Sequence, residues 1–134
     1  MTVSTLAPRA RRRMQPPTPP DAVTQYALDA VAGRVVVGTL VRKAAERHLA
    51  DLANGHERGL TWDAATAEKA IAFFLLLRHY KGEWGPRPGH PLGDPIVLEP
   101  WQMFIVGALF GWKRADGSRR FRSVYVEVAK KNGK

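Results

Sequence analysis

The sequence predicts a mostly α-helical chain with one short extended segment and one β-strand near its end. Four stretches space their apolar residues at helical intervals. Residues 121–128 instead alternate, with Val124, Val126 and Val128 on one side and Tyr125 and Glu127 on the other, which is the period of a strand. The length of 134 residues, 45% of them hydrophobic and 25% charged, fits one ordinary globular core.

Residues 1–20 are predicted to be a disordered basic tail that precedes the folded part, residues 21–134. This stretch has four arginines and no acidic residue. Its prolines, which include Pro16, Pro17, Pro19 and Pro20, fix φ and lack amide donors, so they favour neither helix nor inner strand. The same prolines argue against the amphipathic helix of an organelle transit peptide.

The helices are predicted from caps, stops and apolar spacing, over residues 21–33, 39–53, 63–80 and 100–112. Asp21 caps the first helix, and Glu99 with Pro100 opens the fourth. The third helix is apolar on every side between Ile71 and Leu77. A helix of that kind is normally buried, so the core is expected around Phe73, Phe74 and Leu76. Residues 96–98 are the short extended segment.

Composition excludes several classes of function. Without cysteine the chain has no disulfide framework, thiolate zinc site or cysteine nucleophile. The apolar run 70–77 is too short to cross a bilayer. The four histidines show no metal-ligand spacing, and His48 is expected at the edge of the core. The net charge of +9 gathers at both ends of the chain and favours a polyanionic partner.

A glycine and a lysine close the sequence directly after the predicted strand. A phosphate-binding loop needs a strand that directs it, small residues around the phosphates and a lysine that reaches them. Against the pattern G-x-x-x-x-G-K-[ST], Val128 replaces the first glycine, Gly133 and Lys134 match, and the Ser or Thr would follow Lys134. An ordinary basic tail is the alternative.

Several separated motifs resemble the start of the large subunit of tailed-bacteriophage terminases. The resemblance spans residues 21–134, and its motifs occur in the family's order. They are Leu98–Gln102, Phe110–Trp112, Arg119–Arg122 and Tyr125–Lys134, with His56–Leu60, Ala70–Phe74 and Lys81–Trp84 upstream.

The resemblance implies an α/β parent fold of the P-loop NTPase class. It implies an ATP-driven motor that packages DNA, followed by a nuclease domain that cuts it. Trp101 and Gln102 would form the adenine-recognition element, although a core aromatic and a solvated helix residue are the alternatives. The Walker A cradle would be Ala129, Lys130, Lys131, Asn132 and Gly133, with Lys134 as the catalytic lysine. Lys130 stands where the family often has a catalytic arginine, whose planar fork it lacks.

The same resemblance sets expectations for cofactors and partners. The cofactors would be ATP and Mg²⁺, with the Mg²⁺ ligands beyond Lys134. The partners would be double-stranded phage DNA, the terminase small subunit and the portal protein, in the cytoplasm of a bacterial host. The chain is expected to stop inside the Walker A motif, through truncation, an intein, a contig edge or gene decay, and to be inactive alone.

Two other functions remain open at this point. One is a basic helical module that binds DNA or a packaging partner without any nucleotide. The other is a degenerate prophage remnant.

Overall fold

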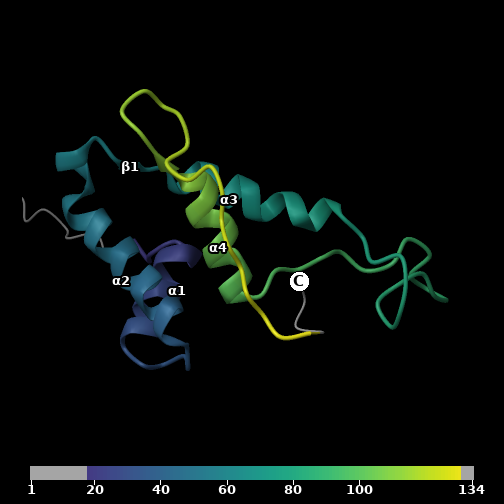
Figure 1. The fold of residues 1–134 in the computed structure, drawn as a ribbon. Helices are drawn as coiled ribbons and strands as arrows, with labels where there is room; N and C mark the ends of the chain where they lie inside the picture. The colour runs from purple at the N-terminus through teal and green to yellow at the C-terminus, as the bar shows by residue number, and fades with distance from the viewer. Residues whose placement is uncertain (1–17, 131–134) are drawn as a thin grey trace, which may run out of the picture.

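The computed structural model describes residues 18–130, so the predicted tail lies outside the description except for its last three residues. Four helices form the body (Figure 1). They are α1 (Ala22–Val31), α2 (Thr39–Asn54), α3 (Ala64–Phe73) and α4 (Pro100–Gly111), with the 3₁₀ turns η1 (Gly55–Arg58) and η2 (Phe74–Leu76) and the strands β1 (Thr61–Trp62) and β2 (Trp112–Lys113). Of the helices described, none has the length and apolarity to span a membrane.

Helix α1 lies at the centre of the packing, against both α2 and α4. Asp21 caps it by accepting hydrogen bonds from the backbone N–H groups of Val23 and Thr24, at 3.1 and 3.0 Å. The face that α1 buries is Val23, Tyr26, Ala27 and Ala30, which is the spacing that the sequence predicted. The ring of Tyr26 packs against that of Phe104 in α4, with 5.3 Å between the centroids.

Two glycines let α4 approach its neighbours closely. A Cβ added to Gly107 would lie 2.2 Å from Cγ2 of the buried Val23, and one added to Gly111 would lie 2.5 Å from the ring of Trp62. Real side chains do not come that close. The predicted start of α4 is confirmed, because Glu99 and Gln102 form a capping box and Pro100 occupies the first helical position.

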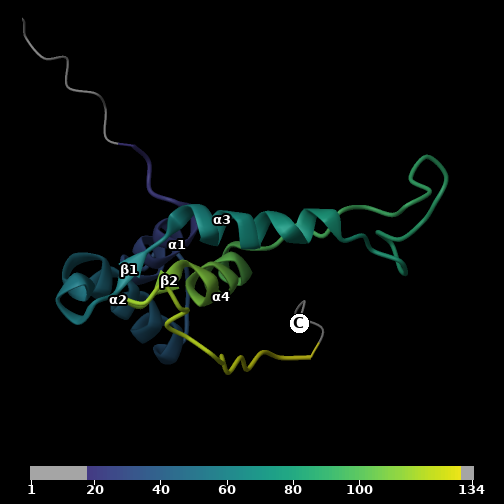
Figure 2. The same cartoon turned by 90° about the horizontal axis from the view of Figure 1, so that it is seen from above.

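The third helix is shorter than predicted, and it is not the centre of the core. It gives way to η2 after Phe73, and Phe73 and Leu76 are 55% and 75% exposed. Figures 1 and 2 show why: the first turns of α3 run along α4, and the rest projects past the end of α4, where no layer covers it. The core lies among α1, α2, the start of α3 and α4.

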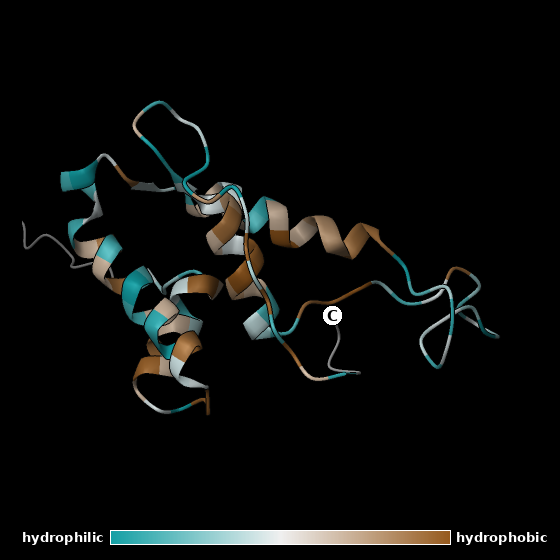
Figure 3. Cartoon of the chain, in the orientation of Figure 1, coloured by the Kyte–Doolittle hydropathy of each residue, from teal (hydrophilic) through white to brown (hydrophobic). Residues whose placement is uncertain are grey.

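Residues 77–98 form a projecting loop that returns to the start of α4. Its two limbs are joined by backbone hydrogen bonds from His79 to Asp94 and from Ile96 to Leu77, at 3.0 and 2.9 Å. The side chains of Arg87 and Asp94 pair at 2.8 Å inside it. Figure 3 shows that the adjoining end of the helical arm is strongly apolar, in agreement with the exposed Phe73, Leu75 and Leu76.

The predicted strand over 121–128 is not a strand in the described chain. This segment runs extended alongside α4, in the opposite direction (Figure 1). It does not pair with residues 96–98, and it has no strand beside it to supply ladder hydrogen bonds. The one sheet in residues 18–130 pairs Thr61 with Lys113 and Trp62 with Trp112, antiparallel.

Gly107→Ala should destabilise the protein by about 1 to 3 kcal/mol, although alanine is the better helix former. The added methyl would collide with Val23, which is 1% exposed and cannot move aside. Urea unfolding followed by circular dichroism measures the change. In a Val23→Ala background the collision is gone, so the same glycine substitution should then cost nothing. An equal loss in both backgrounds would contradict this account of α4 packing.

Candidate functional site

A hollow of about 450 Å³ lies between α2, α4 and residues 120–130, which run back along α4 and are here named the returning segment. Its lining is mostly apolar, with several polar side chains among the apolar ones. The walls include Leu40, Val41 and Ala44 of α2, Trp101, Ile105 and Ala108 of α4, and Val124, Val126 and Val128 of the segment. Its polar lining includes His48, Asp51 and Trp112 from the body and Arg120, Ser123 and Glu127 from the segment.

A continuous chain of hydrogen bonds lies behind this hollow. The indole N–H of Trp112 donates to Nδ1 of the buried His48 at 3.0 Å. Neutral His48 therefore carries its proton on Nε2, which lies 3.1 Å from Oγ1 of Thr24 and donates to it. The Thr24 hydroxyl donates in turn to Oδ2 of Asp21 at 2.9 Å, where the indole N–H of Trp62 also donates at 3.1 Å.

The surroundings of this hydrogen-bond chain fix the charge states of its two titratable residues, His48 and Asp21. Burial lowers the pKa of His48 to about 4, against the attraction of Asp21 and Asp51. Burial opposes the charge of Asp21 as well, but hydrogen bonds from Thr24 and Trp62 outweigh it and leave the pKa of Asp21 below its usual value. His48 is thus a neutral core residue, deeper than the predicted edge position. Residues 18–130 contain no group of three side chains suited to a metal ion.

Asp51 is a buried carboxylate with two arginine partners. Arg58 of η1 binds Oδ1, and Arg120, which begins the returning segment, binds Oδ2. Burial disfavours the charged form, but the hydrogen bond and charge of Arg120, supported by Arg58, keep the pKa of Asp51 low. No motif in the sequence predicted this site. Its signal was a single acidic residue three positions after His48, on the apolar face of a helix.

Two guanidinium groups also face the ring of Phe121. The central carbons of Arg47 and Arg120 lie 5.0 and 4.8 Å from its centroid. The central carbon of the Arg120 guanidinium also lies 5.7 Å from the centroid of the Trp112 ring. The backbone N–H of Arg120 donates a hydrogen bond to the carbonyl of Trp112 at 2.9 Å. Cation–π contacts of this kind fix the start of the returning segment on α2 and β2.

The two predicted adenine-recognition residues lie at the start of α4, in different environments. Trp101 is half-buried, packs against the core and lines the hollow, so its wall position is compatible with either predicted role. Oε1 of Gln102 accepts a hydrogen bond from the backbone N–H of Glu99 at 2.8 Å. Gln102 is therefore a capping residue rather than a simply solvated one.

The predicted phosphate-loop residues are described only at their beginning. Ala129 and Lys130 are exposed at the end of the returning segment. Lys131, Asn132, Gly133 and Lys134 lie outside the described residues. Val128 lines a second hollow together with Pro100, Trp101 and the loop residues 35–38. The fold thus brings the start of α4 and Val128, the residue before the predicted loop, to the lining of one space.

Comparison with known families identifies the last quarter of the chain. Residues 100–134 match the family model for the terminase large subunit, ATPase domain. The match covers α4, the hairpin of residues 113–119 after β2, the returning segment and the predicted phosphate loop, and it confirms the resemblance over residues 100–134. No curated protein and no solved structure matches the chain.

The stability of the protein should fall between about pH 6.5 and pH 4 because of His48. The unfolded chain binds a proton at a pKa near 6.5, while the folded imidazole resists it down to about 4. The stabilisation is complete above pH 6.5 and is lost as the pH falls, by roughly 3 kcal/mol at most. Urea midpoints measured across this range test it.

His48→Gln is the matched control for this pH dependence. A glutamine amide can accept from Trp112 and donate to Thr24, and it does not titrate. The variant should lose the slope between about pH 5 and 6.5, above the range in which Asp21 and Asp51 contribute a slope of their own. If it kept the wild-type slope, another group would be responsible.

Proposed function

Because residues 100–134 match the terminase large subunit, ATPase domain, we propose that this chain belongs to the ATP-driven motor that packages double-stranded phage DNA. The observation that carries the proposal is the family match, which includes the helix with Trp101 and Gln102 and the segment that runs to Lys134. The motor would work in the cytoplasm of a bacterial host, together with a portal protein and a small subunit. DNA cleavage would belong to a nuclease domain outside these 134 residues.

In this proposal Lys134 contacts the β- and γ-phosphates of ATP, and the backbone of Ala129–Gly133 surrounds them. ATP with Mg²⁺ would supply the phosphoryl-transfer chemistry. Two described features fit such a loop. The segment before it is extended, as a strand that leads into a phosphate loop would be, and it ends at the small residue Ala129. Val128 and Trp101 also line one hollow, so a base beside Trp101 would lie near the loop.

The capping box limits how Gln102 can read a base. A side-chain amide matches adenine when its carbonyl and its NH₂ group both take part. Here the carbonyl oxygen already accepts from the backbone of Glu99. Recognition through both groups would therefore open the cap, whereas recognition through NH₂ alone would leave the cap intact.

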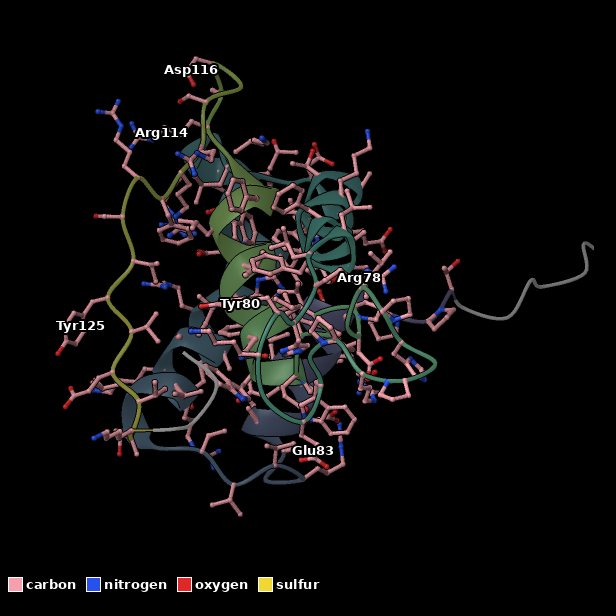
Figure 4. The ribbon with its side chains drawn as sticks, turned by 90° about the vertical axis from the view of Figure 1, so that its right-hand side faces the viewer. Arg78, Tyr80, Glu83, Arg114, Asp116 and Tyr125 are labelled. Carbon is pink, nitrogen blue, oxygen red and sulfur yellow. The ribbon has the colours of Figure 1, made fainter. Side chains whose placement is uncertain are left out.

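A second function, binding to DNA without nucleotide, is favoured by a cluster of exposed basic residues. Arg114, Arg119 and Arg122 are exposed around the hairpin that follows β2. Figure 4 shows Arg114 and Asp116 at the outer end of this hairpin. Phosphate contacts by such residues would give binding that weakens steeply with added salt, with or without ATP.

Lys134→Ala should weaken the binding of a fluorescent ATP analogue about ten- to a hundredfold. The change removes a charge-assisted hydrogen bond worth about 1.5 to 3 kcal/mol. Fluorescence anisotropy with the whole chain measures the dissociation constant. Lys81→Ala, which removes an exposed lysine from the projecting loop, is the control and should bind like wild type. Wild-type affinity in Lys134→Ala would refute the phosphate-loop assignment.

Gln102→Ala should reduce the preference for ATP over GTP about tenfold, through loss of one good hydrogen bond to adenine. Alanine also removes the capping box, so Gln102→Glu is the informative companion. Glutamate keeps the capping oxygen but lacks the NH₂ donor. Both variants should lose nucleotide preference if Gln102 reads the base. A preference retained by the glutamate variant would assign Gln102 to the cap alone.

A further inference from the structure

We propose that Arg120 is a positioning residue: by binding Asp51 it holds the returning segment on α2 and so sets where the phosphate loop begins. Only the assignment of a phosphate loop to the end of the segment rests on the proposed function. The tether itself is a property of the described residues 18–130.

The segment has few other attachments. Within the described part of the chain, the Asp51–Arg120 pair is the one ion pair that joins residues after β2 to a helix. Among the same residues, no backbone hydrogen bond links positions 121–127 to another backbone group. Between its two ends, at Arg120 and Val128, the segment therefore depends on the stacked ring of Phe121 and on side-chain contacts along the hollow.

The two arginine partners of Asp51 differ in burial. The side chain of Arg120 is 16% exposed and that of Arg58 is 58% exposed, while the Asp51 side chain is 4% exposed. Exposed ion pairs are screened by water and contribute little, whereas a buried pair with good hydrogen bonds holds its geometry. Of the two ion pairs of Asp51, the pair with Arg120 is therefore the one that holds a fixed geometry.

The two arginines also differ in what they hold. Arg58 lies in η1, which directly follows α2, so its bond to Asp51 closes a local turn only seven residues apart in sequence. Arg120 lies 69 residues from Asp51. Arg120 and Lys130 are ten positions apart, which spans up to about 33 Å in an extended chain. A small rotation at Arg120 is therefore magnified at the loop.

This difference supplies a matched pair of variants. Arg120→Gln and Arg58→Gln remove the same charge and the same kind of bond from the same carboxylate. In each variant the other arginine remains, so Asp51 is not left as an unpaired buried charge. Only Arg120→Gln removes the ion pair between the segment and α2, and the backbone hydrogen bond from Arg120 to Trp112 stays in both variants. Arg120→Lys, which keeps the charge but loses the planar fork, should restore part of the tether.

The readout is the distance from α2 to the segment. Because the chain has no cysteine, Glu46→Cys and Tyr125→Cys provide two unique sites for spin labels. Both positions are exposed, and Figure 4 shows Tyr125 pointing away from the helices. Pulsed electron–electron double resonance then gives the distribution of distances between the two labels, and circular dichroism checks that the helices remain folded.

Arg120→Gln should at least double the width of this distribution, and Arg58→Gln should leave it unchanged. The fluorescent ATP analogue should bind about tenfold more weakly to Arg120→Gln than to Arg58→Gln. Equal distributions in the two variants would overturn the positioning role. If the wild type bound no nucleotide, the proposed function would fail, while the distances would still decide the tether. Lys134→Ala should change nucleotide affinity without changing the distances.

Discussion

The hydrogen bond between the Trp112 indole and Nδ1 of His48 is the interaction on which the rest of the structure depends. It joins α2 to the end of α4 across 64 positions in the sequence. Through Thr24 and Asp21 the same chain of donors continues to the start of α1, and through Trp62 it reaches β1. One set of side chains thus connects nearly every element of the body.

The direction of these bonds determines what the core tolerates. Each indole can only donate, so Nδ1 of His48 must accept, and the imidazole must be neutral. A protonated His48 would place two donors face to face inside a layer of aromatic rings, which lie 4.8 to 6.0 Å from the imidazole. The chain carries its charges elsewhere, at the partly buried Asp21 and the buried Asp51, where donors or arginines surround each carboxylate.

The same core supports the region that we associate with nucleotide binding. Trp112 is both the donor to His48 and the neighbour of Arg120, so the returning segment starts from the most constrained point of the fold. At its other end, the segment passes the start of α4, where Trp101 serves both the core and the hollow. The packed helices therefore fix the position and the direction of the returning segment, which lies within the match to the terminase ATPase domain.

The sequence by itself determined what local chemistry controls. Caps, prolines and apolar spacing place α1, α2 and the start of α4 within one or two residues of their predicted bounds, because each signal lies within a turn of the element it governs. The resemblance of residues 100–134 to the terminase ATPase domain was also readable from short motifs around Trp101 and Lys134, although most of the predicted phosphate loop lies outside the described residues.

Only the tertiary structure decided which apolar surfaces are covered and which distant charges meet. Phe73 and Leu76 read as core, yet they project beyond the end of α4, since burial depends on what lies opposite a helix. Residues 121–128 alternate like a strand, yet a strand also needs a hydrogen-bonded neighbour, and none lies beside them in the described chain. Asp51 and Arg120 carry no shared motif, because 69 residues separate them and only the packing of α1, α2 and α4 brings them together.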